Sequence, residues 1–104
     1  MDKPAALFSL AGERALVTGA SRGIGAAIAD LLAAQGATVI GTATSDSGVQ
    51  AIADRLAPHG GHGRKLDVVD GAAVEGLIDA IAKDFGPVSI LVNNAGITRD
   101  NLLM

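Results

Sequence analysis

The stretch "RALVTGASRGIGAAIADLL", residues 14–32, decides the fold. Its apolar beginning predicts a β-strand over residues 14–19, and the glycine-rich turn that follows leads directly into a helical pattern over residues 23–36. Gly36 suits the C-terminal end of that helix, because glycine adopts left-handed backbone angles without steric cost. We expect the buried face of the helix to consist of its larger apolar side chains, namely Ile24, Ile28, Leu31 and Leu32.

The alternation of strand and helix continues along the chain. Further strands are predicted over residues 37–44, 63–69 and 88–94, and further helices over residues 47–60 and 70–86. Asp46 and Asp70 suit the N-caps of these two helices. Both helices carry an apolar stripe at helical spacing, with Val49, Ile52, Ala53 and Leu56 in the first and Val74, Leu77, Ile78, Ile81 and Phe85 in the second.

Consecutive apolar residues in the strands predict that the sheet is covered on both faces. Strand-helix-strand units with short links imply right-handed crossovers and parallel strands. The predicted fold class is therefore α/β, a doubly wound parallel sheet.

Composition excludes several classes of protein. A chain of 104 residues is one domain at most, and its 49% hydrophobic content predicts a folded core. A formal charge of −3 argues against a nucleic-acid-binding protein, and every apolar run is too short to span a membrane. The N-terminus does not resemble a signal peptide and the chain has no cysteine, so a cytoplasmic protein is expected. His59 and His62 have no third ligand beside them, and no metal site is predicted.

The turn "TGASRGIG", residues 18–25, places three glycines between strand and helix. Gly19 permits a sharp turn, Gly23 lets the backbone approach a ligand, and Gly25 lets the helix pack close to the sheet. The amides of such a loop and the positive end of the helix suit a pyrophosphate. A phosphate-loop NTPase is disfavoured because no Gly-Lys-Ser/Thr follows, and a methyltransferase is a weaker alternative.

The end of the second strand indicates which dinucleotide would bind. A site for the unphosphorylated cofactor usually has Asp or Glu there to hold the ribose 2′-hydroxyl. This strand ends in "GTATSD", with Thr44 near the expected carboxylate position. The absence of that carboxylate and the presence of Arg22 in the glycine loop favour NADP(H).

"TGASRGIG" together with "NNAG", residues 93–96, resembles the short-chain dehydrogenase/reductase family. "LVNNAGITRDNLLM" and "VIGTATS" are similar to the bacterial members that reduce 3-oxoacyl groups on acyl-carrier protein in fatty acid biosynthesis. The resemblance runs from about Ala15 to the end of the chain. It implies a Rossmann-like sheet with its first four strands in the order 3-2-1-4, NADP(H) as cofactor, an acyl-carrier-protein thioester as substrate, and a homotetramer.

The resemblance also implies roles for individual residues. Asn94 would contact the nicotinamide-side ribose, and Asn93 would link neighbouring strands. Asp67 would bond the adenine amino group, with help from the backbone of Val68. Thr98, Arg99 and Asp100 border either a substrate entrance or an ordinary exposed loop. The full set of expected cofactor-binding residues is Gly19, Ala20, Ser21, Arg22, Gly23, Ile24, Gly25, Thr44, Asp67, Val68, Asn94, Ala95 and Gly96.

In this family a Tyr donates the proton, a Lys lowers the pKa of that Tyr, and a Ser holds the carbonyl oxygen. The chain contains no Tyr, so no catalytic residue is predicted in it. We expect residues 1–104 to be the N-terminal cofactor-binding part of one domain, truncated before its catalytic half. Alone it should be inactive because it has no Tyr. It should also be poorly stable, because the fourth strand would be an open edge. The alternatives are a reductase of acetoacetyl-CoA or another carbonyl, and a nucleotide-binding module without catalysis.

Overall fold

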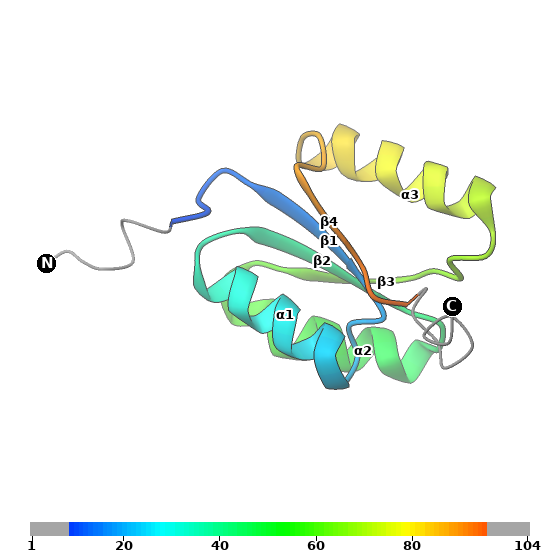
Figure 1. Ribbon diagram of the computed structural model, residues 1–104, viewed down its shortest axis with the longest axis horizontal. Coiled ribbons are helices and arrows are strands. Elements are labelled where there is room, and N and C mark those ends of the chain that lie inside the picture. Colours follow the sequence, from blue (N-terminus) through cyan, green and yellow to red (C-terminus); the bar gives the residue numbers. More distant parts are fainter. Residues whose placement is uncertain (1–8, 96–104) are drawn as a thin grey trace, which may run out of the picture.

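A four-stranded parallel sheet in the order β3-β2-β1-β4 forms the centre of the structure (Figure 1). The computed structural model describes residues 9–95. Its strands are β1 (Arg14–Thr18), β2 (Thr38–Ala43), β3 (His62–Lys65) and β4 (Ile90–Asn93). The predicted α/β class, the parallel pairing and the strand order 3-2-1-4 are confirmed.

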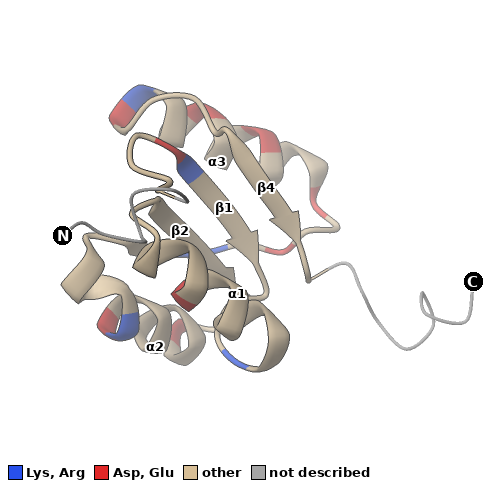
Figure 2. Ribbon diagram, turned by 60° about the vertical axis from the view of Figure 1, so that its left-hand side comes forward, with Lys and Arg blue, Asp and Glu red and all other residues tan. Residues whose placement is uncertain are grey.

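Helices cover both faces of this sheet. The helices α1 (Gly23–Ala34) and α2 (Asp46–Leu56) lie on one face, and α3 (Gly71–Asp84) lies on the other (Figure 1). A 3-10 turn, η2 (Ala57–His59), follows α2 and ends at Gly60, which has a φ of 73°. Acidic residues are spread along α3 (Figure 2), where Glu75 and Asp79 are exposed.

The core has two parts because neighbouring strand residues point to opposite faces of a sheet. Val17 and Val39 pack in the larger cluster, which includes residues of α1 and α2. Leu16 and Ile40 pack in the smaller cluster with Ile81 of α3. All four strand side chains are at most 1% exposed, so β1 and β2 are buried on both faces as predicted.

The expected buried face of α1 is right only in part, since Leu32 is partly buried against the larger cluster. The fully buried residues of this helix are the small ones Gly25, Ala29 and Ala33, which recur every four residues and bring the backbone close to the sheet. Ile24 and Leu31 are instead 73% and 62% exposed. Periodicity alone favoured the large side chains, whereas a close approach between helix and strands selects residues with little side chain.

The stripes of α2 and α3 do face the sheet, with Ile52, Leu56 and Ile81 fully buried. The N-cap predicted for α2 is wrong, because Ser45 accepts the capping hydrogen bond from the Gly48 amide at 3.0 Å and Asp46 lies in the first turn. Asp70 caps α3 as predicted, accepting from the Ala73 amide at 3.1 Å.

The third strand is shorter than predicted and ends at Lys65. Asp67 ends the extended segment, because its carboxylate accepts the Val69 amide at 3.1 Å and its carbonyl accepts the Asp70 amide at 3.0 Å. His62 lies in β3, and the centre of its ring is 4.8 Å from that of Phe85.

Candidate functional site

The site forms where the winding direction of the sheet reverses. β1 pairs with β2 on one side and with β4 on the other, and Thr18 is in register with Asn93. The glycine loop therefore leaves β1 beside the residues that follow β4. In open α/β sheets, ligands bind at this kind of switch point, outside the carboxyl ends of the strands.

The glycine loop holds two residues in left-handed backbone conformations. Gly19 has a φ of 63° and Gly23 a φ of 65°, values that residues with a Cβ rarely adopt. Between them, the Ala20 amide donates to the Thr42 carbonyl oxygen of β2 at 2.9 Å. The loop is thus anchored to the sheet in the middle of its turn.

The φ angle of Gly25 is not positive, so its backbone conformation does not require glycine. Glycine is required here because a side chain would have no space. A Cβ at this position would overlap the Gly19 carbonyl oxygen and lie 2.7 Å from the Asn94 Nδ2 atom. The first turn of α1 consequently lies directly against the start of the loop. The sequence predicts close packing of α1 on the sheet at Gly25, whereas the nearest atoms here belong to Gly19 of the loop and to Asn94, which follows β4.

Asn94 and Thr18 tie the end of β4 to this loop. Asn94 donates its side-chain amide to the Gly19 carbonyl oxygen at 3.1 Å. The Thr18 hydroxyl accepts the Ala95 amide at 2.9 Å and donates to the Asn93 side-chain oxygen at 3.2 Å. Asn93 thus links β4 to β1, as expected for it.

We predict that Thr18→Val lowers the free energy of unfolding by about 1–2 kcal/mol, because it leaves the Ala95 amide without its acceptor. Thr42→Val is the matched control. Thr42 is 1% exposed, and its hydroxyl oxygen has no hydrogen-bond partner among the described residues. Chemical denaturation should show no loss, or a gain, for that variant. Equal losses in the two variants would contradict the role of Thr18.

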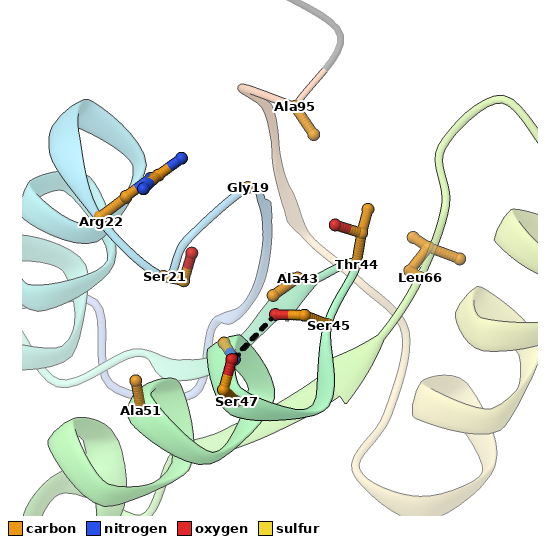
Figure 3. A pocket seen from close by; sticks show the side chains of 11 residues that line it. Gly19, Ser21, Arg22, Ala43, Thr44, Ser45, Ser47, Ala51, Leu66 and Ala95 are labelled. Carbon is orange, nitrogen blue, oxygen red and sulfur yellow. Dashed lines mark hydrogen bonds between the residues drawn. The ribbon is translucent and has the colours of Figure 1, made fainter.

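A cavity of about 510 Å³ opens at the carboxyl ends of β1 and β2 (Figure 3). Arg22 extends from the start of α1, and Thr44 and Leu66 stand on the opposite side (Figure 3). The lining comes from the glycine loop, the end of β2, the start of α2 and the segments after β3 and β4. It consists of Gly19, Ser21, Arg22, Ala43, Thr44, Ser45, Ser47, Gly48, Ala51, Leu66 and Ala95.

The cavity is suited to an anion. Both α1 and α2 begin at its wall, and the first turns of helices carry amide groups without carbonyl partners and a partial positive charge. Arg22 adds a full positive charge, while the described lining residues include no carboxylate. The neighbouring carboxylate of Asp46 lies 3.3 Å from the Lys65 ammonium nitrogen, which offsets its charge.

The structure brings together part of the predicted site. Gly19, Ser21, Arg22, Thr44 and Ala95 line the cavity. Four other expected residues do not line it: Ala20 lies in the turn of the loop, and Gly23, Ile24 and Gly25 form the start of α1. Asn94 supports the loop through its hydrogen bond to the Gly19 carbonyl oxygen. Gly96 lies outside the described residues, as do Thr98, Arg99 and Asp100.

Two expected adenine-binding residues do not line this cavity in the structure. The Asp67 carboxylate accepts the Val69 amide, and Val68 lines a separate apolar cavity of about 110 Å³ on the other face. Leu66 lines the main cavity in their place. The role of Asp67 toward adenine stays a prediction.

Sequence reasoning did not name Ser47, Gly48 and Ala51 as site residues. They reach the cavity because β2 delivers the first turn of α2 to the same wall as the glycine loop. A signal was present in "TSDSG", where a serine N-cap and a glycine begin a helix immediately after the strand. A Cβ at Gly48 would lie 2.7 Å from the Ala43 Cβ atom, so glycine also permits this close approach.

Two further findings concern residues 9–95 alone. They hold no helix of the length and apolar character needed to cross a bilayer. They also bring no three His, Cys, Asp or Glu side chains close enough together to hold a metal ion.

Residues 13–103 match the short chain dehydrogenase family. The chain is 63% identical over 93 residues to a protein of Escherichia coli named 3-oxoacyl-[acyl-carrier-protein] reductase FabG, a match that covers 89% of this chain and 38% of that protein. Proteins of the same name from Vibrio cholerae and Pseudomonas aeruginosa are 62% and 55% identical, each over 93% of this chain and 39% and 40% of their own lengths.

The chain thus spans about two fifths of the curated relatives that it matches. The family match covers the glycine loop, the cavity and the paired ends of β1 and β4. By fold, site and sequence, this chain belongs to the short-chain dehydrogenase family.

Proposed function

We propose that the chain is the cofactor-binding part of an NADPH-dependent reductase of 3-oxoacyl-[acyl-carrier-protein] in fatty acid biosynthesis. The observation that carries this proposal is the convergence of two helix N-termini and Arg22 on one cavity at the switch point of the sheet. A dinucleotide phosphorylated on its adenine-side ribose has two anionic groups to place in such a cavity, the pyrophosphate and the 2′-phosphate. The names of the relatives supply the substrate in the proposal.

The residues at the end of β2 support the proposed preference for NADPH over NADH. Thr44 lines the cavity with a hydroxyl where a carboxylate would repel the 2′-phosphate. Arg22 lies on the cavity wall and can form a charge-assisted hydrogen bond to that phosphate. We propose further that Asp67 and Val68 reach the adenine, and that Asn94, Ala95 and Gly96 face the nicotinamide side.

In the proposed reaction, the bound nicotinamide supplies a hydride to the 3-oxo carbon, and a proton goes to the carbonyl oxygen. These 104 residues contain no Tyr to donate that proton. We therefore propose that they bind and orient the cofactor, as the N-terminal part of one longer domain. In that domain another strand would pair with β4, whose Leu91 is 60% exposed at the sheet edge. A cytoplasmic homotetramer is part of the same proposal.

The test is a titration of NADPH and of NADH against the product of the complete reading frame that contains these residues. Nicotinamide fluorescence measures the binding. We predict NADPH binding at least about tenfold tighter, a difference of roughly 1.4 kcal/mol. NADPH oxidation should then depend on an added 3-oxoacyl thioester, and acyl-carrier-protein and coenzyme A thioesters should be compared.

Four outcomes would change the proposal. Tighter binding of NADH would reject the assigned cofactor, and faster reduction of the coenzyme A thioester would reject the assigned substrate. Binding without turnover of any thioester would favour a nucleotide-binding module. Turnover by residues 1–104 alone would contradict the proposal that catalysis needs further residues.

A further inference from the structure

Arg55 of α2 contacts two elements that lie far from it in the sequence. Its Nε atom donates to the Asp30 carboxylate of α1 at 2.8 Å, and its Nη2 atom donates to the Ala20 carbonyl oxygen of the glycine loop at 2.7 Å. The side chain of Arg55 is 30% exposed, and the Ala20 contact is partly buried. One guanidinium thus joins both helices of this face to the loop between β1 and α1.

The contact with Ala20 fixes a peptide unit in the middle of the loop. The Ala20 residue is fully buried, and its amide already donates to the Thr42 carbonyl oxygen of β2. Its carbonyl oxygen is held by Arg55 from the side of α2. In a planar trans peptide the next N–H points opposite to the carbonyl, so Arg55 also sets the direction of the Ser21 amide. Ser21 itself lines the cavity.

A guanidinium suits this position better than an ammonium group. Arginine presents its donors in a rigid planar fork, so it can bond a carboxylate and a carbonyl in two directions at once. A lysine carries one compact charge on a flexible chain and would not hold both acceptors in fixed positions. The Asp30 carboxylate, 50% exposed, completes the arrangement by orienting the fork.

We propose that Arg55 is a positioning residue that holds the glycine loop in the conformation required for the pyrophosphate of the dinucleotide. This inference rests on the proposed function. It assigns Arg55 a role shared by NADPH and NADH, since both carry the pyrophosphate. Arg22, in contrast, serves the 2′-phosphate that only NADPH carries.

The test compares Arg55→Met, Arg55→Lys and the matched control Arg64→Met, each in the product of the complete reading frame. Arg64→Met removes the same charge at a different place. Arg64 belongs to β3, donates to the Gly63 carbonyl oxygen, and lines a small cavity against α3 on the other face. Dissociation constants for NADPH and NADH are measured at a temperature where circular dichroism shows every variant folded.

We expect Arg55→Met to weaken binding of both dinucleotides about tenfold, as for the loss of one charge-assisted hydrogen bond that orders a binding loop. Arg55→Lys should recover less than half of the loss in binding free energy, and Arg64→Met should bind as the unchanged protein does. In turnover, the KM for NADPH should rise with little change in kcat.

A purely structural role for Arg55 would lower the melting temperature and leave both dissociation constants unchanged, which would overturn the proposal. A loss confined to NADPH would overturn it too, because it would place Arg55 with the 2′-phosphate. If the unchanged protein binds neither dinucleotide, the proposed function fails and this inference fails with it. Binding by the unchanged protein and by Arg55→Met alike would reject the positioning role alone.

Discussion

Gly25→Ala is expected to lower the free energy of unfolding by about 3 kcal/mol and to weaken dinucleotide binding at least about a hundredfold. The added Cβ would overlap the Gly19 carbonyl oxygen and would lie 2.7 Å from the Asn94 Nδ2 atom and 2.9 Å from the Gly19 carbonyl carbon. Two of these three atoms belong to backbone, so no rotation of a side chain relieves the contact.

The same overlap explains the expected loss of binding. Either α1 moves outward, or the Gly19 peptide turns and breaks the hydrogen bond from Asn94 to the Gly19 carbonyl oxygen. The amides at the start of α1 then no longer face the site together with the loop. Chemical denaturation and NADPH titration on the product of the complete reading frame measure the two effects.

Gly76→Ala is the matched control for this substitution. Gly76 lies inside α3, and a Cβ there would meet no atom within 4 Å. Since alanine is the better helix former, we expect Gly76→Ala to raise stability by about 0.5–1 kcal/mol and to leave binding unchanged. Similar losses in both variants would show that any alanine in place of a helical glycine has this effect, and would contradict the steric argument for Gly25.

The parts of the fold that the sequence predicted are those whose signal is local. Alternating apolar strands and helical stripes predicted the parallel sheet and the buried residues Ile52, Leu56 and Ile81, because large side chains on α2 and α3 do face the sheet. The strand order came instead from the resemblance to the family. The rule failed in part on α1, where Gly25 and two alanines are the buried residues and Ile24 is exposed. A pattern of large apolar residues cannot reveal a contact that depends on their absence.

The site divides in the same way. The glycine loop could be identified because its spacing in the chain is itself the geometry that matters. The contribution of α2 could not, because the Ser47 side chain reaches the cavity only through the placement of β2 beside β1. Arg55 was beyond sequence reasoning for a stronger reason, since its acceptors lie 25 and 35 residues away.

Arg22→Ala should weaken NADPH binding about thirtyfold, close to 2 kcal/mol, and should change NADH binding less than about twofold. Arg22 is exposed on the cavity wall, and its side chain makes no capping hydrogen bond to α1. Its removal therefore leaves the backbone of the loop intact and takes away a positive charge that only the 2′-phosphate requires.

Salt provides an independent check on this substitution. Because the Arg22 charge is exposed, added salt should screen it, so NADPH affinity of the unchanged protein should fall with ionic strength more steeply than that of Arg22→Ala. Arg22→Lys keeps the charge and should retain most of the preference for NADPH, losing only the forked geometry. Equal losses for NADPH and NADH in Arg22→Ala would contradict this assignment and would place Arg22 on the pyrophosphate. The preference for the phosphorylated cofactor would then have to come from another residue, and Thr44 on the cavity wall is the candidate.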